Sequence, residues 1–152
     1  MSNENVEALS QTEHNVIGAA LFELVASCPH IPSGVNPQYQ SIGEKESIGF
    51  FTLPGSKYLK WDISGGFTAQ VNFQVAYKSF PASNQQRLDS QTITDNIMAW
   101  LENVDELPLL SGGRRITKIT ASNSLPYKDS TGADKSITFA ADAVLEYRKK
   151  GF

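Results

Sequence analysis

The chain has 152 residues, of which 40% are hydrophobic and 19% charged, a composition that excludes a mostly disordered chain, a collagen-like chain and a coiled coil. Its net charge of -3 argues against a protein built mainly to bind nucleic-acid phosphates, and its single cysteine excludes an internal disulfide. No apolar run approaches the ~20 residues of a membrane span and residues 1–10 lack signal-peptide features, so we expect a soluble, non-exported protein with no membrane partner.

The first predicted element is an amphipathic helix over residues 5–27. Apolar side chains recur there at helical spacing, and Thr12 is a candidate N-cap inside the segment. Several prolines follow over residues 28–47, and they allow neither a helix nor a central strand to continue. We therefore expect residues 28–47 to form an irregular connector.

The clearest pattern in the sequence is an alternation of apolar and mostly polar residues over 67–78. Period two over this length predicts a long strand with one apolar face. Two shorter strands are predicted before it, at 48–53 and 58–63, and the Pro54-Gly55 pair between them favours a hairpin. The polar face of the long strand carries mostly neutral hydrogen-bonding side chains, namely Thr68, Gln70, Asn72, Gln74 and Lys78.

A second helix and two further strands are predicted in the second half of the chain. Apolar residues return to helical spacing over 84–104, and strand character follows over 114–122. A turn-rich loop at 129–135 precedes a last strand over 136–148. The predicted order of elements is thus α-β-β-β-α-β-β.

This order predicts the α+β class, with a mainly antiparallel sheet and two helices packed on one of its faces. The length fits a single domain over residues 1–152. Within it, the helix at 5–27 and the connector at 28–47 precede the sheet and second helix at 48–150.

The reactive side chains of the sequence form no recognisable catalytic arrangement, so we expect no enzyme. Cys28 and His30 straddle a proline, which rarely aligns a thiol with an imidazole, and no orienting Asp or Asn is identifiable. Zinc needs three or four ligands, and only His14 joins these two as a soft or imidazole candidate. We expect no catalytic residue, no metal site and no cofactor.

Two basic segments have more than one possible role. Arg114 and Arg115 follow Gly112-Gly113, and this pattern suits a small anion site, an edge-strand guard or an interface. The run Arg148-Lys149-Lys150 suits a solvated terminus or a subunit contact better than a nucleic-acid site, since few aromatic residues accompany it.

Short signatures along residues 58–149 resemble the phage tail terminators, a family also called minor capsid proteins in long-tailed phages of Gram-positive hosts. They comprise Asp62-Ile63-Ser64-Gly65-Gly66 before the strand at 70–77, the helix end Met98-Ala99-Trp100-Leu101-Glu102, the pair Leu107-Pro108, a strand that opens with basic residues, and the closing Leu145-Glu146-Tyr147-Arg148.

The resemblance implies a structural virion protein that forms a homohexameric ring, ends growth of the tail tube and joins the head connector. Its partners would be its own copies, the tail tube protein and the neck proteins, with DNA passing through the lumen without specific binding. Acidic side chains, Asp142 among them, are candidates to line that lumen. The candidate interface comprises the polar strand face given above together with Arg114, Arg115, Lys128, Asp129 and Asp134.

Two other functions remain open. A different head-tail connector, a stopper or a tail-tube protein would share a small sheet-rich design and ring assembly. A small enzyme or small-molecule binder would instead need a pocket between the sheet and the helices.

Overall fold

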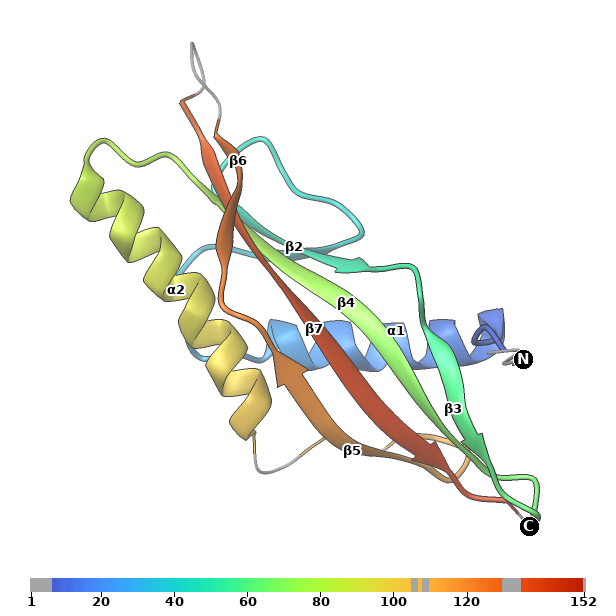
Figure 1. The fold of residues 1–152 in the computed structure, drawn as a ribbon. Helices are drawn as coiled ribbons and strands as arrows, with labels where there is room; N and C mark the ends of the chain where they lie inside the picture. The colour runs from blue at the N-terminus through green and yellow to red at the C-terminus, as the bar shows by residue number, and fades with distance from the viewer. Residues whose placement is uncertain (1–6, 105–106, 108–109, 130–134, 152) are drawn as a thin grey trace.

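The computed structural model describes residues 7–104, 107, 110–129 and 135–151, and of residues 127–129 the backbone alone. Two helices and a seven-stranded, mostly antiparallel open sheet make up this part of the chain, which confirms the α+β class (Figure 1). The elements are α1 (Gln11–Ala26), β1 (Pro37–Tyr39), β2 (Ser47–Thr52), β3 (Lys57–Trp61), β4 (Phe67–Ser79), α2 (Asn84–Asn103), β5 (Arg114–Ala121), β6 (Leu125–Asp129) and β7 (Ile137–Lys149).

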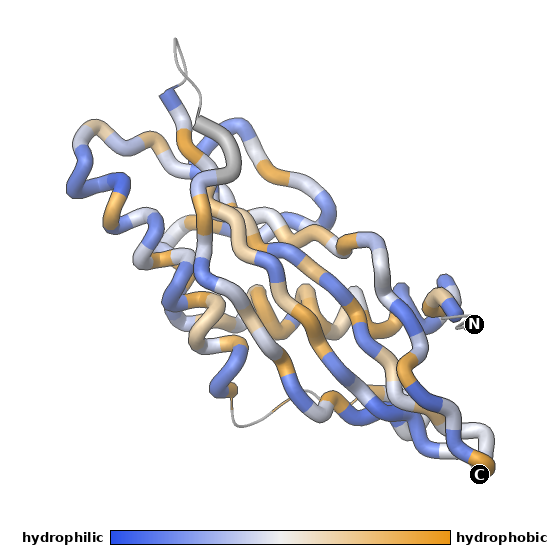
Figure 2. Tube along the Cα trace, in the orientation of Figure 1, coloured by the Kyte–Doolittle hydropathy of each residue, from blue (hydrophilic) through white to orange (hydrophobic). Residues whose placement is uncertain are grey.

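The long strands β4 and β7 form the centre of the sheet. They pair antiparallel over 13 residues each, from Phe67 opposite Lys149 to Ser79 opposite Ile137. The predicted alternation is confirmed, since the apolar side of β4 is buried along its whole length, and β4 alternates in hydropathy in Figure 2. The buried face packs against side chains of both helices in one hydrophobic core.

The predicted hairpin of β2 and β3 is wrong. Both strands pair antiparallel with β4, so they run in the same direction along one of its edges and do not pair with each other. The Pro54-Gly55 turn interrupts this edge without reversing the direction of the chain. Just before the turn the amide of Leu53 still donates to the carbonyl of Asn72 on β4. Together β2 and β3 act as one interrupted strand.

The far side of the sheet repeats this arrangement. Strands β5 and β6 both pair with β7, and the amide of Ser122 between them donates to the carbonyl of Asp142. Two strands were not predicted, β6 and the parallel β1 beside β2. Each is five residues or shorter and contains a proline, which a strand tolerates best at an edge.

Helix α1 begins later than predicted. Ser10 is its N-cap and accepts a hydrogen bond from the amide of Glu13, whereas the sequence favoured a start at residue 5. Residues 7–9 are extended instead, because Ala8 forms a bridge with Lys57 at the start of β3. No helix in the described residues is long and apolar enough to cross a membrane.

Gly66 lies where the turn before β4 passes the end of β7. An added Cβ there would lie 2.6 Å from the nitrogen of Gly151 and 2.6 Å from the carbonyl oxygen of Lys149. Because backbone atoms cannot move aside as side-chain ends do, we expect Gly66→Ala to lower the free energy of unfolding by about 1–3 kcal/mol. Gly43→Ala is the control in urea unfolding, since its Cβ would meet only side-chain atoms. Equal losses in both variants would contradict this expectation.

Candidate functional site

The candidate site is the face of the sheet opposite the helices, here called the outer face. The core residues of both helices pack with the other face, so neither helix covers the outer face. The connector reaches its β2 side, where Ile42 lines a hollow with Ala76 and the Gly43 carbonyl accepts a hydrogen bond from Lys78 Nζ. The candidate side chains of β4 line its centre and are all partly exposed. The structure thus brings together Thr68, Gln70, Asn72, Gln74 and Lys78, as the alternation predicted.

Hydrogen bonds hold these polar side chains in a fixed arrangement. The Gln70 amide donates to Asn72 Oδ1 at 3.2 Å, and Asn72 Nδ2 donates to the carbonyl of Pro54 at 3.1 Å. Gln74 Nε2 donates to Asp142 Oδ1 of β7 at 2.9 Å. Because these amides retain further donors and acceptors, the face offers ordered neutral groups to a partner surface.

One half of the outer face is apolar and hollowed on both sides of Gln74. A hollow of about 440 Å³ is lined by Phe51 and Ala76 among others. A second hollow of about 290 Å³ is lined by Leu125 and Ala140. The Leu125 side chain is 69% exposed. Sequence reasoning missed this patch because its residues come from four different strands and meet only through the register of the sheet.

The other half of the outer face is basic. Lys60, Thr68, Arg148 and Arg115 stand at paired positions in one row across β3, β4, β7 and β5. Lys57 and Lys118 occupy the next row, with Gln70 and Glu146 between them. In a chain of net charge -3, this concentration of cations means that charge is unevenly distributed over the molecule.

Arg114 does not offer its guanidinium to a partner, contrary to the expectation from the sequence. Its Nε and Nη2 donate to the two carboxylate oxygens of Glu13 at 2.7 and 2.6 Å, and Tyr147 Oη donates to the same carboxylate at 2.9 Å. Glu13 is only 5% exposed. The bonds from Arg114 hold the pKa of the Glu13 carboxyl below its ordinary value, although burial opposes this shift.

The remaining predicted interface residues are separated. Arg115 is exposed at the edge of the sheet, and Lys128 and Asp129 belong to β6, opposite Thr138 and Ile137. Asp134 lies outside the described residues, as does most of the predicted loop at 129–135. The candidate interface is therefore best defined by the outer-face residues of β4 and β7, and Arg115 lies at the edge beyond them.

The soft and acidic side chains do not converge in the part of the chain that the structure describes. No three His, Cys, Asp or Glu residues there are grouped closely enough to hold a metal ion. Cys28 is buried, and burial raises the pKa of its thiol, which lowers the thiolate fraction at neutral pH.

Comparisons with known proteins add no family assignment. No protein-family model matches this chain, and no characterised protein matches it in sequence at a significant level. Function is therefore inferred from the residues of the outer face and their arrangement.

Proposed function

We propose that this chain is a structural virion protein of a long-tailed phage, a tail terminator whose copies form a homohexameric ring. The ring would cap the tail tube and join it to the head connector. The observation that carries the proposal is the outer face of β4 and β7, which is long, ordered by hydrogen bonds, and covered by neither helix. The resemblance of residues 58–149 to tail terminators supports the same function.

The chemistry of this face suits burial between subunits. A neutral amide that finds a partner costs little to remove from water, whereas an unpaired charge costs several kcal/mol. The half of the face around Gln74 combines such amides with exposed apolar surface from Leu125 and Val144. A closed ring needs a contact between two different surfaces of the same chain, and this half of the face supplies one of them.

The basic half of the outer face is not expected to line the channel through which DNA passes. Cations that line a DNA channel would bind phosphates and slow the passage of the genome. We therefore propose that the row of Lys60, Arg148 and Arg115 faces away from the lumen.

Gln74→Glu tests the interface directly. The variant places a carboxylate opposite Asp142 and removes the amide donor, so a buried interface would contain two unpaired like charges. We expect at least a tenfold rise in the protein concentration needed for half-maximal assembly on tail tubes, with the fold retained. Light scattering across concentrations and electron microscopy of tails measure this effect.

Gln85→Glu on α2 is the matched control, because its amide also donates to an aspartate, Asp89, at 3.0 Å. It makes the same chemical change away from the outer face and should assemble normally. Equal assembly of the two variants would contradict the proposed interface. The function itself is tested by omitting the chain during tail assembly: tubes of uncontrolled length without heads support it, and normal joined virions reject it.

A further inference from the structure

A hollow of about 650 Å³ lies at the start of β5, away from the half of the outer face proposed to join subunits. Its lining includes Arg115, Ile116 and Thr117 of β5 together with Arg148 and Lys150 at the end of β7. Ile116 is buried on the helix side of the sheet, whereas Arg115 is exposed on the outer face. The hollow thus lies at the start of β5 beside the end of β7, and Leu107 of the segment after α2 also lines it.

This edge has unused hydrogen-bonding capacity. In the described residues β5 pairs with β7 and with no other strand, so its second edge presents backbone amides and carbonyls. At the far end of β5, the Ala121 amide donates to the Glu102 carboxylate of α2 at 2.9 Å. Among the described residues, no strand covers the part of this edge beside the hollow.

The hollow also carries uncompensated positive charge. Arg115 stands directly opposite Arg148, and like charges at paired positions of a sheet destabilise it. Asp62 neutralises Arg148 through a 2.7 Å ion pair, but Arg115 has no ion pair with the described residues. Lys150 lines the same hollow, and its backbone is fixed there because its amide donates to the carbonyl of Gly113. A carboxylate beside Arg115 would supply the counter-ion that the described residues lack there.

We propose that the edge of β5 binds an extended, acidic polypeptide segment, which adds a strand to the sheet and places carboxylates beside Arg115 and Lys118. Both side chains are exposed, and both stand at outer-face positions of β5. A strand with acidic residues at alternate positions presents its carboxylates to this face. The inference concerns a single copy of the chain and does not depend on the proposed ring.

A polypeptide fits this site better than a nucleic acid does. Only a polypeptide can continue the backbone ladder of β5.

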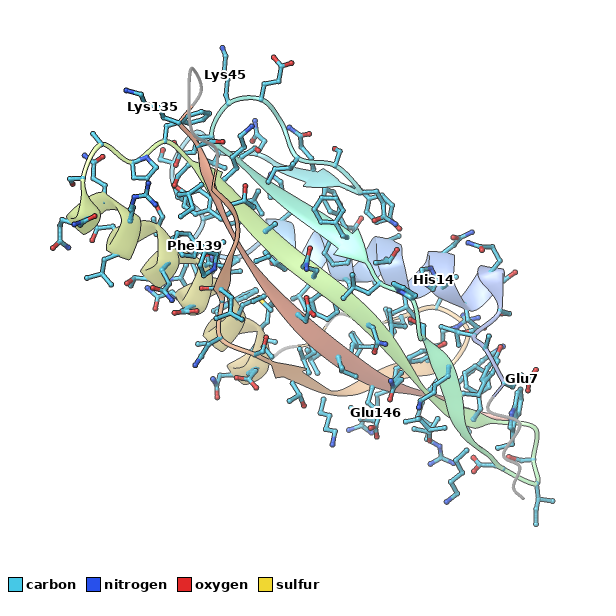
Figure 3. All side chains as sticks on the ribbon, turned by 45° about the horizontal axis from the view of Figure 1, so that its top comes forward. Glu7, His14, Lys45, Lys135, Phe139 and Glu146 are labelled. Carbon is cyan, nitrogen blue, oxygen red and sulfur yellow. The ribbon has the colours of Figure 1, made fainter. Side chains whose placement is uncertain are left out.

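The test uses the full chain and the peptide acetyl-(Thr-Glu)4-amide at low salt, followed by amide NMR and calorimetry. We expect saturable shifts at the amides of β5. Arg115→Gln combined with Lys150→Gln should weaken binding about tenfold. Lys45→Gln combined with Lys135→Gln makes the same charge change at the opposite end of the sheet from Glu146 (Figure 3) and should change binding less than twofold.

Two further probes separate the contributions to binding. A peptide methylated at alternate amide nitrogens keeps its carboxylates but cannot complete the ladder, and we expect it to bind at least tenfold more weakly. Equal binding of the methylated peptide, or no binding of the parent peptide at millimolar concentration, would overturn the proposal. Tighter binding of a 20-base-pair DNA duplex through Arg115 and Lys150 would also overturn it, in favour of a nucleic-acid site.

Discussion

Replacing Glu13 by glutamine is expected to lower the free energy of unfolding by about 3–5 kcal/mol at pH 7. The Glu13 carboxylate is buried and accepts hydrogen bonds from Arg114 and Tyr147, with Lys149 Nζ 4.0 Å away. Without the negative charge, the Arg114 guanidinium, whose side chain is 9% exposed, remains buried without its counterion. This contact joins the start of α1 to the ends of β5 and β7, so its loss should loosen the attachment of α1 to the sheet.

Glu23→Gln is the matched control, because Glu23 lies on the same helix and is exposed. We expect its free energy of unfolding to stay within about 0.5 kcal/mol of the wild-type value. Urea unfolding followed by circular dichroism measures both variants. A Glu13→Gln loss as small as that of the control would show that the buried pair does not hold the helix in place.

The difference between wild type and Glu13→Gln should also depend on pH. The folded-state pKa of the Glu13 carboxyl is lowered, chiefly by hydrogen bonds from Arg114. A lowered folded-state pKa stabilises the protein fully above the unfolded-state value of about 4.3, and that contribution disappears as pH falls through the folded-state value. The stability gap should therefore be constant from pH 7 to about 5 and should shrink below about pH 4.

Replacing Phe73 by alanine is expected to lower the free energy of unfolding by about 3–5 kcal/mol, as much as the loss of the Glu13 carboxylate. Phe73 is fully buried at the middle of β4, and its ring stacks on Phe50 of β2 with the ring centroids 5.5 Å apart. Removing the ring leaves a cavity at the centre of the sheet, where the surrounding strands cannot close in without breaking the backbone ladder. The variant should unfold at a much lower urea concentration.

Two other substitutions sharpen this test. Phe73→Leu keeps most of the volume and should cost less than about 1.5 kcal/mol, which provides a folded variant if Phe73→Ala does not fold. Thr68→Val on the opposite face of the same strand should change stability by about 0.5 kcal/mol or less, since Thr68 is partly exposed. Comparable losses for Thr68→Val and Phe73→Ala would contradict the assignment of the buried face.

Patterns within single elements were sufficient to predict much of the fold. The alternation over 67–78 identified the buried and outer faces of β4, and helical spacing placed α2 with its start at residue 84. The prediction of Thr12 as an N-cap is wrong, because Ser10 is the N-cap of α1 and Thr12 lies inside the helix. The Ser10-Gln11-Thr12-Glu13 pattern is typical of a capping box, in which the glutamate returns to the N-cap amide. In the folded chain the Ser10 amide donates to Tyr58 Oη instead, and Glu13 pairs with Arg114, 101 residues away in the sequence.

The sequence by itself determined which side chains share a face within each long strand or helix, because that depends only on backbone periodicity. The tertiary structure alone decided which strands are neighbours and in which register. It placed β2 and β3 along β4 rather than against each other, and it aligned Lys60, Arg148 and Arg115 in one row. Such contacts join residues far apart in the chain, and they form only when burial of a common core fixes the position of every strand.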